Sequence, residues 1–325
     1  MVNTHKTPEV LPPQWCQWPR KPPKAPSEPR KPSSKVEPRT QVIEGVLYER
    51  HTSPYAYIAT IHALNNGQVE AGVRPQYGWR EVGNLTPCAQ QAYLEACENP
   101  VIASPLELEE RHKSNRERAT KRARSLVRRR CKHQGLVEIL TLTYRENQID
   151  RERMARDLDV FLKRVRRVVH NFEYVAVFER QKRGAWHAHL AVRRILPLYV
   201  VGTGKNQKMV KSFDLLRSMW RGVVGSDNGN IDVSKRRKQR WSPAKIAGYI
   251  SKYIGKNFGD NLKHENSYSS SNGSMPAPIR YSFATGVDAF FGLHDLLSLE
   301  LANANKYETL FPNTGFWISI SPRTG

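Results

Sequence analysis

The segment FEYVAVFERQKRGAWHAHLAV, residues 172–192, contains two apolar runs separated by a short turn that includes Gly184. Runs of β-branched and aromatic residues on either side of a Gly-containing turn are typical of a β-hairpin. The segment therefore predicts two antiparallel strands, over residues 172–179 and 185–192, which form the centre of the fold.

The segments before this hairpin predict another strand and a helix. Residues 136–144 (LVEILTLTY) are β-branched and apolar, which favours a central strand. Apolar residues recur at helical spacing over 150–170, which indicates a helix packed on the sheet.

The segments after the hairpin continue the same pattern. Turn residues over 193–211 predict a loop, and helices are expected at 212–222 and at 243–257, where Ser242 and Pro243 provide the start signals. Further strands are expected at 230–237 and, as the last one, at 279–285. This order predicts an α+β fold, an antiparallel sheet with flanking helices on one face.

Four regions are expected along the chain. Residues 1–42 are rich in Pro, Lys and Ser and predict a disordered basic tail, and residues 43–132 predict a mostly helical basic accessory region that binds DNA. The sheet lies in a domain over 133–286, and 287–325 form a C-terminal extension. Within the accessory region, residues 105–132 predict a single helix, rich in Lys and Arg, that either tracks phosphates or forms a solvated face.

The charge of the chain favours a nucleic-acid partner. The 325 residues include 52 Lys and Arg against 30 Asp and Glu, a net charge of +22, and such an excess usually faces a polyanion. No apolar run approaches the roughly 20 residues of a membrane span, so no membrane role is expected and the cytoplasm is the predicted location. The four cysteines form no C-x-x-C pair, which argues against zinc fingers.

His187 and His189 form the first candidate site. Residues two apart on a strand point to the same face, so these imidazoles can chelate one divalent ion. If the hairpin places Glu179 opposite His187, its carboxylate completes a set that suits Mg²⁺ or Mn²⁺. The alternative is two histidines on a polar sheet face.

The second candidate site is YISKYIGK, residues 249–256, which repeats Y-x-x-K. On a helix, Tyr249, Tyr253, Lys252 and Lys256 share one stripe about 100° wide, beside a face of isoleucines. A phenol is a weak nucleophile when neutral, and neighbouring ammonium groups favour the phenolate. Either a tyrosine nucleophile or an amphipathic helix with tyrosines at its rim fits this pattern.

The tetrapeptide Gly202–Lys205 resembles the end of a phosphate-binding P-loop. The pattern G-x-x-x-x-G-K-[ST] requires Gly at position 199 and Ser or Thr at 206, where this chain has Tyr199 and Asn206. No nucleotide site is therefore expected here, and a helicase that unwinds DNA must be a separate protein.

Three motifs together resemble those of replication initiators in the HUH endonuclease superfamily. LTLTY (140–144) resembles the first motif, ERQKRGAWHAHLAV (179–192) the metal motif, and YISKYIGK (249–256) the tyrosine helix of the two-tyrosine class. That class includes the gene A protein of small icosahedral phages and related phage and plasmid initiators. The resemblance covers about 135–285.

The resemblance implies a ferredoxin-like sheet with a metal on one face and the tyrosine helix packed beside it. It implies that His187, His189 and Glu179 bind the metal and that Tyr249 and Tyr253 are nucleophiles. The expected function is initiation of rolling-circle replication. The enzyme would nick and rejoin single-stranded DNA at an origin through a 5′-phosphotyrosine, with a host helicase and DNA polymerase as partners in a bacterial cytoplasm.

Two rival functions fit the same motifs. A transposase or relaxase of a mobile element would use the same chemistry, and a non-catalytic DNA-binding protein could share the fold. In either case, the helix over 105–132 and the basic tail are expected to add DNA affinity without chemistry.

Overall fold

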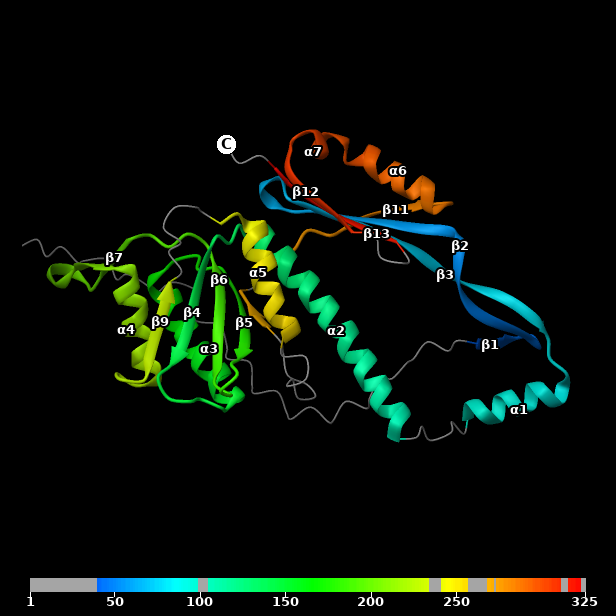
Figure 1. Ribbon diagram of the computed structural model, residues 1–325, viewed down its shortest axis with the longest axis horizontal. Coiled ribbons are helices and arrows are strands. Elements are labelled where there is room, and N and C mark those ends of the chain that lie inside the picture. The colour runs from blue at the N-terminus through cyan, green and yellow to red at the C-terminus, as the bar shows by residue number, and fades with distance from the viewer. Residues whose placement is uncertain are drawn as a thin grey trace, which may run out of the picture.

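The chain folds around two antiparallel sheets joined by one long helix, α2 (Pro105–His133) (Figure 1). The computed structural model describes residues 40–98, 105–233, 241–256, 268–271, 273–310 and 315–322. The predicted tail lies outside this description apart from Thr40–Gln41–Val42, which belong to a strand. The α+β class with antiparallel sheets is confirmed.

The central sheet contains the predicted hairpin and has five strands. Its order across the sheet is β10 (Tyr268–Ser270), β5 (Tyr174–Arg180), β6 (Trp186–Val192), β4 (Glu138–Tyr144) and β9 (Gly229–Val233). Each neighbouring pair is antiparallel. The strands predicted at 136–144, 172–179 and 185–192 are confirmed. The strand predicted at 230–237 is present at its start, and its remainder lies outside the described residues.

One face of the central sheet is covered by α3 (Arg151–Val168) and α4 (Ser212–Val224). Helix α3 begins where the Asp150 carboxylate accepts hydrogen bonds from the backbone amides of Glu152 and Arg153, which caps the helix. The predicted helical spacing is confirmed, because its apolar stripe is buried. Phe161 and Trp220 pack edge to face at 5.7 Å, so these two helices also contact each other.

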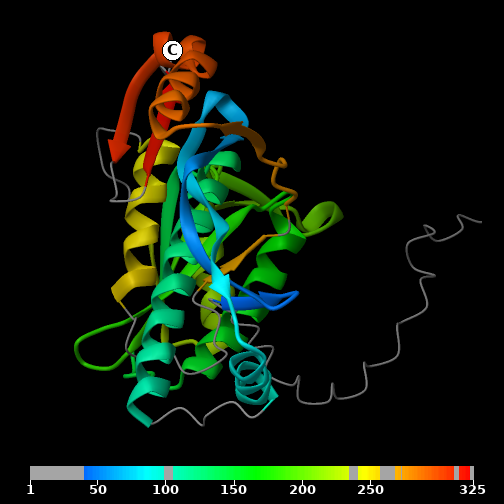
Figure 2. The same ribbon diagram turned by 90° about the vertical axis from the view of Figure 1, so that its right-hand side faces the viewer.

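The opposite face of the central sheet is covered by α5 (Pro243–Lys256) and the last turns of α2. The two helices lie side by side (Figures 1 and 2). Val127 and Cys131 of α2 and Ile246, Ile250 and Ile254 of α5 are buried together against the strands. Helices therefore flank both faces of the sheet, and the prediction of helices on one face is wrong.

The outer sheet has six strands drawn from both ends of the sequence. Its order is β1 (Thr40–Ile43), β2 (Val46–Ala63), β3 (Val69–Asn84), β13 (Phe316–Pro322) and β12 (Ala304–Leu310), with β11 (Ile279–Phe283) paired to β2. Helices α6 (Gly286–Leu296) and α7 (Ser298–Ala302) lie on one face of it. Segments expected as an N-terminal region and a C-terminal extension thus share one sheet.

The prediction of a mostly helical region over 43–132 is wrong for residues 46–84, which form β2 and β3. Alternate residues of these strands, such as Ala59, Ile61 and Ala71, are buried in the core beneath α6. Small alanines give this two-residue period little apolar contrast, which is why it was missed. Helices do form at α1 (Pro87–Glu98) and, as predicted for 105–132, at α2.

Two smaller expectations also differ from the structure. The segment 193–211 is not only a loop, because β7 (Leu198–Val201) and β8 (Lys208–Lys211) form a hairpin there. Gly202 turns this hairpin at φ +96°, where a Cβ would collide with the carbonyl oxygen of Asn206. The strand predicted last, β11, joins the outer sheet and is followed by two more strands.

A buried charge cluster fastens α2 to the outer sheet. The Glu70 carboxylate of β3 accepts a hydrogen bond from Arg128 Nε at 2.7 Å and lies 2.8 Å from Lys132 Nζ. Lys132 also donates to Ser319 Oγ of β13 at 2.6 Å. The side chains of Glu70 and Lys132 are each only 2% exposed, so these charges balance one another away from water.

Candidate metal and tyrosine site

The β5–β6 hairpin gathers the predicted metal ligands on the face that α5 covers. Glu179 lies directly opposite His187 in the register, as the sequence predicted. His189 lies diagonally across from Glu179, and its Nε2 is 2.8 Å from the Glu179 Oε2 atom. Both histidines are buried, each 7% exposed. The three predicted ligands therefore form one cluster.

Each imidazole is held through its Nδ1 atom by a neighbouring polar side chain. Thr141 Oγ1 of β4 lies 3.1 Å from His189 Nδ1, and Gln181 Nε2 lies 3.1 Å from His187 Nδ1. Such contacts fix the orientation of an imidazole and, through its tautomer, the nitrogen left for a ligand. Here that nitrogen is Nε2 on both rings.

Thr141 and Gln181 were not among the site residues predicted from the sequence. Thr141 lies in the alternating LTLTY segment, but its pairing with His189 depends on the β4–β6 register. Gln181 lies in the hairpin turn, where sequence spacing does not fix side-chain direction.

His187 carries the clearest sign of a missing ligand. Its Nε2 atom is buried and has no hydrogen-bond partner among the described residues, and a buried polar atom without a partner is costly. The pKa of His187 is lowered to about 4 by its burial and then by the nearby His189 and Arg183, against the opposing charge of Glu179. The ring is therefore neutral at pH 7, which is the form that binds a metal.

The cluster is not arranged as a finished metal site. No group of three His, Cys, Asp or Glu side chains within the described residues has the placement of a metal-binding set. The direct contact between Glu179 and His189 occupies the space between two expected ligand atoms. The donor types fit a divalent ion, but Glu179 and His189 must separate to admit one.

Helix α5 places both predicted tyrosines against this cluster. The Tyr253 ring stacks on the His189 ring with centroids 4.3 Å apart and planes 19° apart. The Tyr253 hydroxyl donates a hydrogen bond to the Tyr249 hydroxyl at 2.5 Å. The two phenol oxygens therefore occupy nearly one position at the edge of the histidine cluster.

The pattern within α5 explains how the tyrosines are held. Ser242 caps the helix, because its Oγ accepts a hydrogen bond from the Lys245 amide at 3.3 Å. The predicted isoleucine face is confirmed, since it packs on the sheet. Trp241, which was not among the predicted site residues, packs edge to face against Tyr249 with centroids 5.2 Å apart.

The electrostatic setting of Tyr253 differs from the expectation that lysines would lower its pKa. Burial raises the pKa of Tyr253, and the hydrogen bond to Tyr249 and the charge of Glu179 raise it further. Lys252 is exposed, and the side chain of Lys256 lies outside the described residues. The phenol of Tyr253 is therefore strongly neutral in this arrangement.

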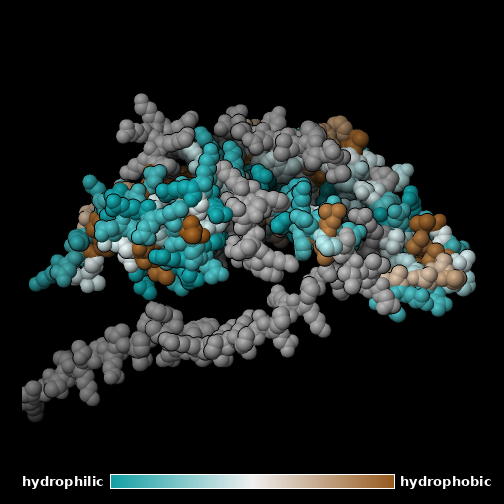
Figure 3. All heavy atoms as spheres, turned by 60° about the horizontal axis from the view of Figure 1, so that its bottom comes forward, coloured by the Kyte–Doolittle hydropathy of each residue, from teal (hydrophilic) through white to brown (hydrophobic). Residues whose placement is uncertain are grey.

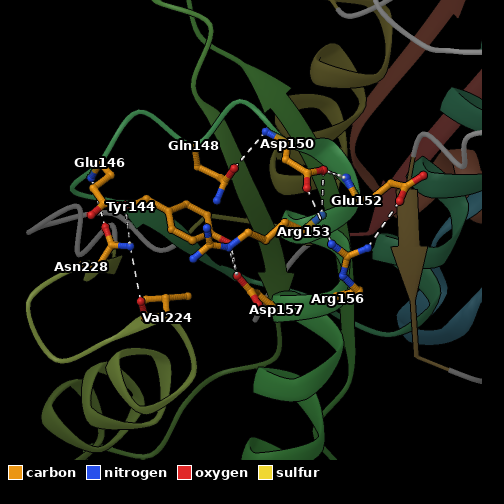
Figure 4. Close-up of polar contacts among 10 residues, drawn as sticks. All are labelled: Tyr144, Glu146, Gln148, Asp150, Glu152, Arg153, Arg156, Asp157, Val224 and Asn228. Atoms are coloured by element: carbon orange, nitrogen blue, oxygen red, sulfur yellow. Dashed lines mark hydrogen bonds and ion pairs between the residues drawn. The ribbon is translucent and has the colours of Figure 1, made fainter.

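The loop between β4 and α3 supports the strand that carries the histidines. Figure 4 shows this loop, where the Tyr144 hydroxyl donates to Asp157 at 2.7 Å across the start of α3. The backbone oxygen of Gln148 accepts from the Trp186 amide at 2.8 Å, and the backbone oxygen of Ile149 accepts from the Trp186 indole at 3.1 Å. Trp186 directly precedes His187, so these bonds fix the beginning of β6.

Similarity to known proteins points to DNA replication. Residues 137–258 match the family model of the replication-associated protein ORF2 and its relatives. This segment runs from β4 through α5 and so contains every candidate ligand and both tyrosines. No curated protein and no solved structure matches the chain. No helix within the described parts of the chain is long and apolar enough to cross a membrane.

Proposed function

Because residues 137–258 are similar to replication-associated proteins, we propose that this protein initiates rolling-circle replication. It nicks and rejoins single-stranded DNA through a tyrosine. The observation that carries this proposal is the meeting of the Tyr249 and Tyr253 hydroxyls beside the His189 ring. Two nucleophiles at one position suit a reaction in which one strand end is passed between them.

The topology of the central sheet supports an endonuclease core of the HUH type. The order β9-β4-β6-β5 is that of a ferredoxin-like sheet, with α3 and α4 on one face. The histidine pair lies on the opposite face, beneath α5. A metal on one face with a tyrosine helix beside it is the arrangement that this class of enzyme uses.

The proposed reaction exchanges one phosphodiester for another. A tyrosine oxygen attacks the phosphorus, the bond from phosphorus to the 3′-oxygen breaks, and a 5′-phosphotyrosine and a free 3′-hydroxyl result. The phenol gives up its proton and the leaving oxygen gains one, so atoms and charge balance. No nucleotide hydrolysis is needed, because the energy of the broken bond is retained in the new one.

His187, His189 and Glu179 are the proposed ligands of a Mg²⁺ or Mn²⁺ ion. When bound, such an ion supplies positive charge that makes the scissile phosphate a better electrophile. Thr141 and Gln181 hold the two rings by their Nδ1 atoms, so that both Nε2 atoms remain on the inner side of the cluster. Tyr253 closes the site from above by stacking on His189.

The two tyrosines would act in turn. The first opens the origin and retains the 5′ end, and the free 3′-hydroxyl primes synthesis. The second cuts the regenerated origin, and rejoining releases a single-stranded circle. A host helicase and polymerase would supply unwinding and synthesis in the bacterial cytoplasm.

Mapping the covalent intermediate tests the proposal. Protein is incubated with Mn²⁺ and single-stranded DNA from its own replicon, and the peptide that carries a nucleotide is identified by mass spectrometry. We expect the adduct on Tyr249 or Tyr253 and none in the Tyr249→Phe/Tyr253→Phe variant. Tyr199→Phe, in the remote β7–β8 hairpin, is the control and keeps the adduct. An adduct on any other residue, or none at all, contradicts the proposal.

Two observations favour a second candidate, a DNA-binding protein that does not cut. The described residues contain no preformed three-ligand metal group, and burial raises the pKa of Tyr253. Binding of DNA without any adduct, across a range of Mg²⁺ and Mn²⁺ concentrations, would support this candidate.

A further inference from the structure

The outer sheet has an apolar face and a polar face. Ala59, Ile61 and Val73 point into the core beneath α6 and α7. Because neighbours on a strand point to opposite faces, Thr60 and Arg74 lie on the other face, which looks toward α2. This second face is polar and is covered only in part.

Helix α2 contributes different residues to its two neighbours. Val127 and Cys131 are buried against α5 and the central sheet. Ser125 and Arg129, on the opposite side of the helix, line a groove of about 220 Å³ against the polar face of the outer sheet. The other lining side chains that matter here are Thr60, His62, Arg74 and Trp317. The tyrosine site and this groove thus lie on opposite sides of one helix.

The groove carries more positive than negative charge. Among the described residues that line it, Glu70 has the only carboxylate, and that carboxylate already contacts Arg128 and Lys132. Arg74 and Arg129 add two further guanidinium groups, and Arg280 is paired with Thr60 on the adjacent strand. An uncompensated cluster of arginines in a groove attracts phosphate.

Burial lowers the pKa of Arg129, and the nearby Arg128 lowers it further while Glu70 opposes them. A bound anion would relieve this crowding of positive charge. Arg129 is positioned by a 2.6 Å contact between its Nη1 and Nε2 of His62. The guanidinium is therefore held in place before any ligand arrives.

Beyond the groove, β2 and β3 continue as a two-stranded ribbon, visible on the right of Figure 1. Tyr77 and Trp79 are 65% and 40% exposed on β3. The Arg50 guanidinium of β2 lies 4.5 Å from the centre of the Tyr77 ring, and Arg50 pairs directly with Trp79. Exposed rings interleaved with arginine form a surface on which bases stack.

The same end of the molecule also exposes aliphatic residues. Ile43, Val82 and Leu94 are each about half exposed, and Figure 3 shows hydrophobic patches among hydrophilic ones at its right-hand end. Contiguous exposed apolar surface marks an interaction site. Flat rings beside such surface suit unpaired bases better than a duplex, whose bases are stacked inside.

We propose that the outer sheet binds single-stranded DNA, with phosphates in the groove at Arg74, Arg129 and Arg280 and bases on Tyr77 and Trp79. This surface goes beyond the proposed nicking function and does not depend on it. Its role would be to hold the strand while the tyrosine site, on the other side of α2, is open. It gives the protein a second grip on DNA.

Binding without cleavage tests the groove. Anisotropy of a labelled mixed-sequence single strand is measured over a range of salt in the presence of chelator, so that no nicking occurs. Arg74→Glu/Arg280→Glu should bind at least about tenfold more weakly, and its salt slope should fall by roughly 0.7 for each phosphate that is no longer neutralised. Both residues are exposed, so the fold should persist.

The matched control reverses two exposed charges away from the groove. Arg167→Glu/Lys208→Glu, on α3 and β8, changes the net charge equally. If both double variants lose the same affinity and slope, the effect is one of overall charge and the groove assignment is overturned.

A second pair of variants tests the ribbon. Tyr77→Ala/Trp79→Ala should weaken single-strand binding by roughly 5-fold to 100-fold per ring, with an unchanged salt slope and little effect on duplex binding. Tyr199→Ala is the control, because its ring lies in the β7–β8 hairpin. Unchanged single-strand affinity, or an equal loss for duplex, overturns the assignment of the ribbon to single strands.

Discussion

His187 and His189 differ in what their Nε2 atoms contact. That of His189 meets the Glu179 carboxylate, whereas that of His187 is buried without a partner among the described residues. The structure thus has one ligand ready and two that contact each other. A divalent ion would give every one of these atoms a partner, which is the physical reason to expect it.

We predict that His187→Ala/His189→Ala abolishes nicking but leaves most DNA binding, because Lys and Arg supply the affinity. Nicking is measured with a labelled single strand and titrated Mn²⁺. His170→Ala, an exposed histidine after α3, is the control and should nick normally. Full nicking by the double variant, or by the unmodified protein in excess chelator, would rule out the metal.

Glu179→Ala provides an independent check of the same site. Loss of this carboxylate should raise the metal concentration needed for nicking by about tenfold or more. An unchanged titration would indicate that the third ligand comes from another element.

For the tyrosines, we predict that Tyr249→Phe and Tyr253→Phe each still nick, while neither efficiently releases circles and the double variant does neither. Completing the cycle requires a free hydroxyl while the other tyrosine holds the 5′ end. Circle formation on single-stranded DNA is the measurement. If one variant fails to nick and the other releases circles normally, a single tyrosine acts.

The two single variants should also differ in pH dependence. Burial raises the pKa of Tyr253, so the phenolate fraction at neutral pH is small and grows about tenfold per pH unit below that pKa. Tyr249→Phe, which leaves Tyr253 as nucleophile, should therefore nick slowly at pH 7 and gain rate as pH rises. Equal rates with flat pH profiles would show that metal binding removes this difference.

At the scale of elements, helix α2 has two halves with different roles. Its residues 111–124 are mostly exposed and basic. The arginines of its last turns, which were expected as phosphate-tracking candidates, instead contact protein: Arg128 binds Glu70, Arg129 contacts His62, and Arg130 donates to the Ser271 carbonyl. Removing 1–132 to test DNA affinity would therefore also remove part of the core.

A charge change confined to the first half of α2 avoids that problem. Replacing Arg111, Lys113, Lys121 and Arg122 with Gln should weaken DNA binding and flatten its salt dependence, with unchanged stability. Anisotropy titrations at several salt concentrations give the slope. An unaltered slope would mean that this half of the helix is only a solvated surface.

The second half of α2 is tested through Glu70. Breaking a buried charge cluster by removing one partner costs about 3–5 kcal/mol, so Glu70→Gln should lower the free energy of unfolding by that order. Urea unfolding measures it. Glu49→Gln, in an exposed pair with Arg80, is the control and should change stability by under about 1 kcal/mol. Similar losses in both variants would contradict the role of the cluster.

The same residue predicts a pH effect. Burial alone would raise the pKa of Glu70, but the hydrogen bond from Arg128 and the charge of Lys132 outweigh it and lower the pKa below 4.5. The stabilisation is therefore complete above pH 4.5 and is lost as pH falls through the lowered pKa. Glu70→Gln should lack this part of the acid sensitivity.

Element by element, the sequence predicted the central sheet better than the outer one. Caps such as Asp150 and Ser242, together with strong apolar periods, determine the helices locally. The Thr141 and Gln181 contacts depend on strand register and turn geometry, which no local pattern encodes. The outer sheet was missed because its strands alternate small and polar residues and find their partners across most of the chain.

At the scale of the whole molecule, the outer sheet depends on its last strands. Phe316, Ile318 and Ile320 of β13 fill the core between β3 and α6. Deleting residues 304–322 should therefore abolish hydrogen-exchange protection in β2 and β3, while β4, β5 and β6 stay protected. Hydrogen exchange read by mass spectrometry tests this. Equal loss in both sheets would show that they fold as one unit.

The pairing of β3 with β13 also orders events on the ribosome. The described strands of the central sheet follow one another between residues 138 and 270, so that sheet can close as soon as they emerge. By then β3 has waited throughout with one edge unpaired, a state prone to association with other chains. The nascent protein would hold its tyrosines in place before its outer sheet is sealed. A pause in translation before β13 would expose that edge for longest.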